Sequence, residues 1–242
     1  MPEETNPFAA PQTADFTPPE VAWLQSSSKS LGSVKLGLTL VYTGICCLLL
    51  WLMTVPVLVS SEAFGPVEDL LNQRALLAVC GGVLVLISLV FFAGEVLCHS
   101  APTEIKGKPL VVASIVLQGL TLVLVCAAFV VQPAEGTLFL WCLATGLVAF
   151  ASLNCFVLFM YSVARFIKRP DVSGRAVRTI VFGIAAILVL YVSLAAAYTK
   201  RMNMENVSAV VGWSIFIGAC ATLIGLVMYA NTVTYLRKAI SA

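Results

Sequence analysis

The sequence predicts an all-α fold, a polytopic membrane bundle of six transmembrane helices with both chain ends in the cytoplasm. Of its 242 residues, 60% are hydrophobic and only 11% are charged, whereas soluble domains carry about 25% charged residues. The hydrophobic residues gather in six long runs that are nearly free of ionisable side chains. The basic residues fall almost entirely on alternate connections between these runs.

Each run is long enough to cross a bilayer as a helix. A helix needs about 20 apolar residues to span a hydrocarbon core about 30 Å thick, and only a helix or closed barrel satisfies its backbone there. Barrel strands alternate in polarity over runs of about ten residues, and these runs do not. We expect a six-helix domain over 31–238, with approximate spans 36–58, 75–98, 109–131, 137–164, 178–199 and 207–236.

Residues 1–30 form a segment of different composition. Its first part is rich in Pro, Thr, Ala and Glu, which is typical of a disordered tail. Thr17 and Glu20 flank two prolines with the spacing of a helix-capping box. We therefore expect a disordered cytoplasmic tail with a short helix at the membrane surface near 18–25.

The distribution of basic residues predicts how the chain is threaded. Eleven of the 14 Lys and Arg residues lie before the first run, after the last run, or in the second and fourth connections. The other three lie in the remaining connections. Because cytoplasmic segments retain Lys and Arg, both termini are predicted to be cytoplasmic.

Several functional classes lack support in the sequence. A net charge of +2 and the lack of a basic stripe interleaved with aromatics argue against nucleic-acid binding. The eight cysteines are scattered without a CxxC pair, so no metal site or redox motif is predicted. Motifs of hydrolases, metalloproteases and phosphate-binding loops are also missing. We expect a non-enzymatic protein without a cofactor, whose main partner is the lipid bilayer.

Glu95 and His99 are the first candidate functional pair. Four residues apart, they share a face if the second helix continues past them, and the two side chains can then hydrogen-bond. Ionisable groups at membrane depth often mark function. The favoured interpretation is a helix end at the membrane surface where the carboxylate reaches water; a proton relay or a membrane enzyme using both residues is the alternative.

Polar residues inside the runs form a second set of candidates. They line a polar path if they face one cavity; the favoured interpretation is hydrogen bonding between helices, which contributes about 0.6 to 2 kcal/mol per contact. The fourth connection is the most basic part of the chain, and it either contacts anionic lipid or only enforces topology. The candidates in the runs are Gln118, Asn154 and Asn231, and those in the connection are Arg165, Lys168, Arg169, Arg175 and Arg178.

Similar spacing after the second and fourth runs raises the question of an internal repeat. In each place an aromatic residue precedes a proline, and Gly107 or Gly174 follows. A repeat of three hairpins and a chance likeness both remain open.

Three short segments resemble a loose group of bacterial six-helix membrane proteins to which no activity is assigned. They are Asn6–Pro11, the helix end Glu95–Pro102, and Leu158–Asp171. The resemblance implies the six-helix fold and a bacterial cytoplasmic (inner) membrane, and it implies no activity.

These observations favour a structural, accessory or signalling membrane component that contacts a membrane-protein partner or a second copy of itself. The alternative is a passive pore or carrier for a small neutral or apolar solute, with Gln118, Asn154 and Asn231 facing one cavity.

Overall fold

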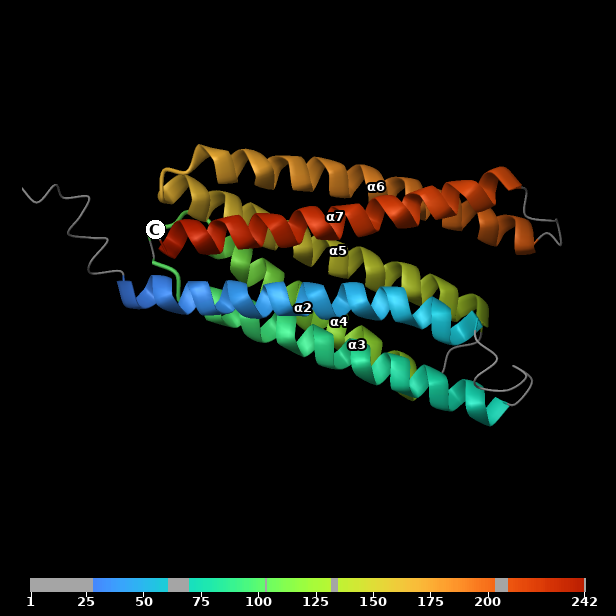
Figure 1. Cartoon of the computed structure of the whole chain (residues 1–242). Coiled ribbons are helices and arrows are strands. Elements are labelled where there is room, and N and C mark those ends of the chain that lie inside the picture. The colour runs from blue at the N-terminus through green and yellow to red at the C-terminus, as the bar shows by residue number, and fades with distance from the viewer. Residues whose placement is uncertain (1–27, 61–69, 103, 132–134, 203–208, 242) are drawn as a thin grey trace, which may run out of the picture.

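The computed structural model describes residues 28–60, 70–102, 104–131, 135–202 and 209–241, which form six helices and no strand (Figure 1). All six helices are long and apolar enough to cross a membrane. The predicted all-α, six-helix membrane bundle is therefore confirmed, whereas the predicted tail and surface helix at 18–25 lie outside the described residues. The helices are α2 (Ser28–Ser60), α3 (Leu70–Cys98), α4 (Lys108–Val131), α5 (Glu135–Phe166), α6 (Pro170–Met202) and α7 (Ala209–Ser241).

Helix α6 begins at Pro170, well before the expected start near residue 178. Proline is tolerated in the first helical turn, and Asp171 beside it complements the positive end of the helix dipole. The preceding helix ends in a left-handed cap, in which Lys168 has φ 56° and the Arg169 N–H donates to the Ala164 carbonyl at 2.9 Å. The basic fourth connection is thus mostly helical.

The six helices form a ring in chain order, and α7 closes the ring by packing against α2. Packing is most extensive within three hairpins, α2–α3, α4–α5 and α6–α7. The ends of α2, α4 and α6 and the starts of α3, α5 and α7 lie at the end of the bundle opposite the start of α2 and the end of α7 (Figure 1). We call the end that holds the start of α2 and the end of α7 the terminal end. The proposed sequence repeat stays a prediction, although the chain does form three hairpins of one orientation.

The α2–α3 hairpin is closed by glycines. A Cβ atom built on Gly94 would lie 2.8 Å from the carbonyl oxygen of Gly37, and one on Gly37 would lie 2.7 Å from Cys98 Sγ. Small residues let transmembrane backbones approach closely, which is how helices pack where lipid supplies no hydrophobic drive. This contact fixes the rotation of α3 near its C-terminal end.

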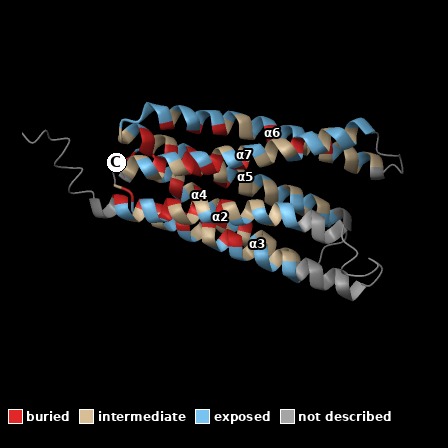
Figure 2. Cartoon of the chain, in the orientation of Figure 1, coloured by how far each residue is buried: buried red, intermediate tan, exposed pale blue. Residues whose placement is uncertain are grey.

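Buried residues gather in the half of the ring nearest the terminal end (Figure 2). The connection between α3 and α4 also turns inward there, since Ala101 is 2% exposed and Ile105 is 1% exposed. The terminal half is therefore a packed core. Its largest apolar side chains below 2% exposure include Leu38, Phe156, Phe159, Met160 and Leu236.

Polar side chains also join neighbouring helices along the ring. The Trp141 indole N–H donates to the Leu124 carbonyl at 2.9 Å, and the Tyr191 hydroxyl donates to the Leu143 carbonyl at 3.0 Å. The hydroxyls of Thr179 and Thr232 lie 3.1 Å apart between α6 and α7. Such bonds are the expected interhelical role of polar groups in lipid.

Candidate functional site

The candidate site forms around Glu95, in the last turn of α3. Its neighbour Gly94 faces α2, and successive helical residues are rotated by about 100°. This rotation directs the Glu95 side chain toward α4, where it becomes 1% exposed. A charged residue is almost never fully buried unless it has partners. The contacts of the Glu95 carboxyl group therefore decide how it can lie in the core.

Ser114 contacts one oxygen of the carboxyl group, and Ser152, from the same second hairpin, contacts Ser114. Ser114 Oγ on α4 lies 2.8 Å from Glu95 Oε1, 2.9 Å from the carbonyl oxygen of Ser152 on α5, and 3.1 Å from Ser152 Oγ. In return, Ser152 Oγ donates to the Ser114 carbonyl at 3.0 Å. Both serines are 0% exposed. This cluster joins three helices through four short contacts.

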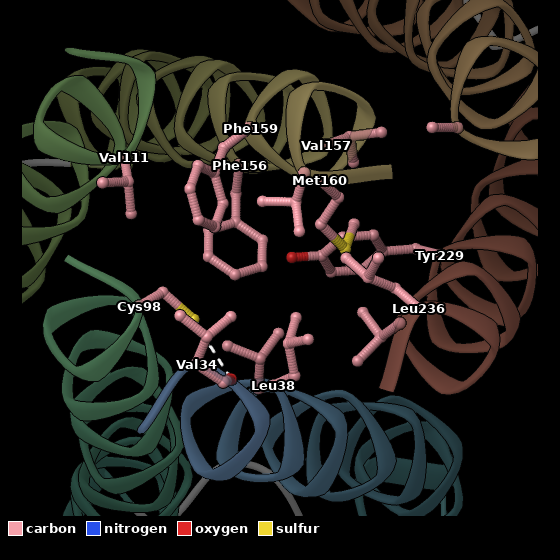
Figure 3. Packing of buried hydrophobic residues seen from close by; sticks show 14 of the residues in the cluster. Val34, Leu38, Cys98, Val111, Phe156, Val157, Phe159, Met160, Tyr229 and Leu236 are labelled. Carbon is pink, nitrogen blue, oxygen red and sulfur yellow. Dashed lines mark hydrogen bonds between the residues drawn. The ribbon is translucent and has the colours of Figure 1, made fainter. Parts of the chain in front are cut away.

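Two polar atoms near the cluster have no hydrogen-bond partner. Glu95 Oε2 and the Tyr229 hydroxyl are both buried and unpaired. Tyr229 is 3% exposed and comes from α7, in the third hairpin. Figure 3 shows its hydroxyl directed away from α7 toward the centre of the ring, beside Phe156. An unpaired buried polar group lowers the stability of the folded state by about 1 to 3 kcal/mol. These two atoms therefore destabilise the core if nothing bonds them.

Apolar packing separates the cluster from solvent at the terminal end. Cys98 and Val34 are 0% exposed, and Cys98 Sγ lies 3.8 Å from the Val34 carbonyl oxygen (Figure 3). The α3–α4 connection packs on α5, because a Cβ on Gly107 would lie 2.6 Å from Ser162 Cβ. These contacts shield the carboxyl group from solvent at the terminal end.

No family model, curated protein or solved structure matches the chain. A carboxyl group enclosed with three hydroxyl groups can hold or release a proton and can hydrogen-bond a small polar molecule. Within the described residues, no group of three His, Cys, Asp or Glu side chains converges in a way that would bind a metal ion.

The structure separates Glu95 from His99. Helix α3 ends at Cys98, and the His99 N–H still donates to the Glu95 carbonyl at 3.1 Å, but the imidazole is exposed in the following turn. The expectation that the Glu95 carboxylate reaches surface water is wrong, because its side chain is directed into the bundle. A shared pocket for the two residues is not formed.

The cavity lined by three amides, which was the alternative interpretation of these residues, is also not formed. Gln118 on α4 is buried, Asn154 on α5 donates to the Phe150 carbonyl of its own helix at 2.8 Å, and Asn231 on α7 is exposed. In addition, α4 and α7 are not neighbours in the ring. The three amides face different surroundings, so the prediction of a common polar path through them is wrong.

All five basic candidates of the fourth connection are exposed at the terminal end. Arg175 lies over the ring of Tyr235, with its guanidinium carbon 3.9 Å from the ring centroid. Arg165 lies 5.8 Å from the centroid of Tyr161 in the same arrangement. Cation–π contacts of this kind stabilise by about 0.5 to 2 kcal/mol, and they orient two of the five charges.

Ser114, Ser152 and Tyr229 were missed in the sequence. Single serines recur throughout the runs, so nothing local distinguishes Ser114, which contacts Glu95, or Ser152, which contacts Ser114. Tyr229 fits an aromatic residue at the membrane surface equally well. The sequence feature that indicates the site is Glu95 itself. An acidic residue directly after a helix-packing glycine points away from the helix that the glycine contacts, and in this ring it points toward α4.

Proposed function

We propose that this integral membrane protein is a non-enzymatic accessory or signalling component of a bacterial cytoplasmic membrane, with both termini in the cytoplasm. The observation that carries the proposal is the filled interior of the terminal half. Phe156, Phe159 and Met160 are each 0% exposed where a conduit would need open space. We propose that a bundle packed in this way acts by changing conformation and by contacting another protein. That protein is a membrane-protein partner or a second copy of the chain.

The exposed basic residues support a cytoplasmic placement of the terminal end. Near an anionic membrane surface, each such residue contributes about 1 kcal/mol of attraction. Arg165, Lys168, Arg169, Arg175 and Arg178 would lie at the headgroup level, where the rings of Tyr161 and Tyr235 orient two of them. We propose that this cluster contacts anionic lipid as well as fixing the topology.

Purification from native membranes tests the proposal. The tagged chain is extracted in mild detergent, and proteins and lipids that remain bound are identified by mass spectrometry. We expect a stoichiometric membrane-protein partner or a homo-oligomer, together with enriched anionic lipid. Substitution of Arg165 and Arg169 by Gln should reduce the bound anionic lipid without removing the partner.

A solute-flux assay tests the alternative, a passive pore or carrier. The purified protein is placed in vesicles loaded with small neutral solutes, and empty vesicles serve as the control. Recovery of the chain alone, together with a defined solute leak, would overturn the proposed role and return the protein to the class of passive carriers.

A further inference from the structure

The three helical hairpins meet at a single polar junction within the described residues. Glu95 comes from the α2–α3 hairpin, Ser114 and Ser152 come from α4–α5, and the buried Tyr229 hydroxyl, directed toward the centre of the ring, comes from α6–α7 (Figure 3). We propose that this junction is a binding site for a proton and a bridging water molecule, with the proton on the Glu95 carboxyl group and the water between Glu95 Oε2 and the Tyr229 hydroxyl.

The hydrogen-bond inventory of the serines supports a protonated carboxyl group. Ser114 Oγ has one hydrogen, but it lies within bonding distance of Glu95 Oε1 and of the Ser152 carbonyl oxygen. If the carboxyl group is ionised, the Ser114 hydrogen goes to only one of these two acceptors. If Oε1 carries a proton, the carboxyl group donates to Ser114 Oγ, Ser114 donates to the Ser152 carbonyl, and Ser152 donates to the Ser114 carbonyl. Each of these three contacts then contains a hydrogen, whereas the ionised state has only two hydroxyl hydrogens for the three contacts.

The surrounding charges point the same way. Within the described residues Glu95 has no ion-pair partner, and an isolated buried charge is very unfavourable. The titratable groups that face it are uncharged thiols and a phenol: Cys98 on α3, Cys155 on α5 and Tyr229 on α7. On the neighbouring helices, the cationic side chain of Lys35 (α2) is exposed, that of Lys108 (α4) is half-buried where the helix begins, and Tyr42 of α2 is half-buried.

The two unpaired atoms supply the second half of the site. Buried waters typically make about three hydrogen bonds to polar groups that would otherwise be unsatisfied. Glu95 Oε2 is an acceptor, and the Tyr229 hydroxyl is both donor and acceptor. A water molecule between them links the first hairpin to the third, so the neutral junction connects all three hairpins.

Release of the proton should loosen this junction. The ionised carboxyl group no longer donates to Ser114 Oγ, and an uncompensated charge remains in the packed terminal half. In the pH range where the folded protein keeps this proton and the unfolded chain has already released it, the folded protein binds more protons, so stability falls as the pH rises. This property goes beyond the proposed accessory role and needs no partner.

Infrared spectroscopy of the purified protein in lipid nanodiscs tests the site directly. The chain has twelve Asp and Glu residues, so wild-type protein is compared with Glu95→Gln, which keeps the size and neutrality of the side chain. At neutral pH we expect one carbonyl band of a protonated carboxyl group that shifts in D2O and is missing in Glu95→Gln. A neutral-pH spectrum without this difference band overturns the proposal.

Stability against pH gives a second readout. Above about pH 5, where a carboxyl group of the unfolded chain is ionised, the unfolding equilibrium of the wild type should shift relative to Glu95→Gln by up to about tenfold for each pH unit until the folded protein also loses the proton. Parallel profiles would contradict proton binding at Glu95. Both measurements use isolated protein, so their failure is distinct from failure to find a partner.

The water bridge is tested by Tyr229→Phe, with the exposed Tyr235→Phe as the matched control. Loss of the Tyr229 hydroxyl should shift the Glu95 carbonyl band. In the control variant Tyr235→Phe, the band should not move. If the band does not move and Tyr229→Phe is more stable than the wild type, the hydroxyl is an unpaired group in a dry core, and the bridge is refuted.

Discussion

The contact of Gly94 on α3 with the backbone of α2 provides a sharp test of the packing. In the variant Gly94→Ala, the new methyl group would lie 2.8 Å from the Gly37 carbonyl oxygen, 2.8 Å from Val41 Cγ2 and 3.0 Å from the Val41 nitrogen. Two of these atoms belong to the backbone of α2, which cannot move aside as a side chain can. The two helices must therefore separate.

The magnitude follows from comparison with a second glycine on the same helix. A Cβ on Gly82 meets no atom within 4 Å. Replacing Gly by Ala inside a helix gains up to about 1 kcal/mol at either position, so this contribution cancels in the comparison. The remaining difference is the overpacking penalty, which is about 1 to 3 kcal/mol. Gly94→Ala should be less stable than Gly82→Ala by that amount.

Reversible unfolding in mixed micelles measures this difference. Increasing fractions of a denaturing detergent are added, and helicity and tryptophan fluorescence are followed for the wild type and both variants. We expect Gly82→Ala to match or exceed the wild type in stability. If Gly94→Ala is as stable as Gly82→Ala, α2 and α3 do not approach at Gly37 and the orientation assigned to Glu95 is refuted.

Three further predictions concern hydrogen bonds and topology. Ser114→Ala should lower the free energy of unfolding by about 1 to 3 kcal/mol, because its buried partners lose their bonds. The control variant Ser100→Ala, at an exposed position, should change the free energy of unfolding by less than about 0.5 kcal/mol. Equal effects of the two variants in the same unfolding assay would refute the cluster. Tyr191→Phe removes the bond to the Leu143 carbonyl and should cost about 0.6 to 2 kcal/mol, and an unchanged unfolding midpoint would contradict that bond. Periplasmic reporter fusions should be active at each of the three connections predicted to be external, and a cytoplasmic signal at any one would break the predicted threading; the fusion points are Gly65, Ala134 and Asn203.

The six helices could be predicted because length and apolarity are sufficient to identify a membrane span. The early start of α6 could not be predicted in the same way. Arg175 and Arg178 mark where the apolar run begins, but a helix needs only its backbone bonds and a suitable first turn, which Pro170 and Asp171 provide. Hydropathy thus locates the part of a helix that lies in lipid, and the chain continues as a helix beyond it.

The candidate site was only partly predictable. Glu95 was identified, but pairing it with His99 assumed that α3 continues through residue 99, whereas the helix ends at Cys98. The partner of its carboxyl group is Ser114, which Ser152 contacts in turn, and both serines come from later helices. The Gly94–Glu95 sequence indicates that the carboxyl group points away from α2, but no local pattern shows which residues of α4 and α5 lie there.

Chemical labelling of carboxyl groups tests most directly the central claim that Glu95 lies inside the bundle. Protein in nanodiscs is treated with a water-soluble carbodiimide and an amine, and modification is quantified by peptide mass spectrometry. Glu104 is exposed in the α3–α4 connection and serves as an internal control. We predict rapid labelling of Glu104 and protection of Glu95 until the protein is unfolded. Labelling of both at the same rate would place Glu95 at the membrane surface and contradict the buried junction.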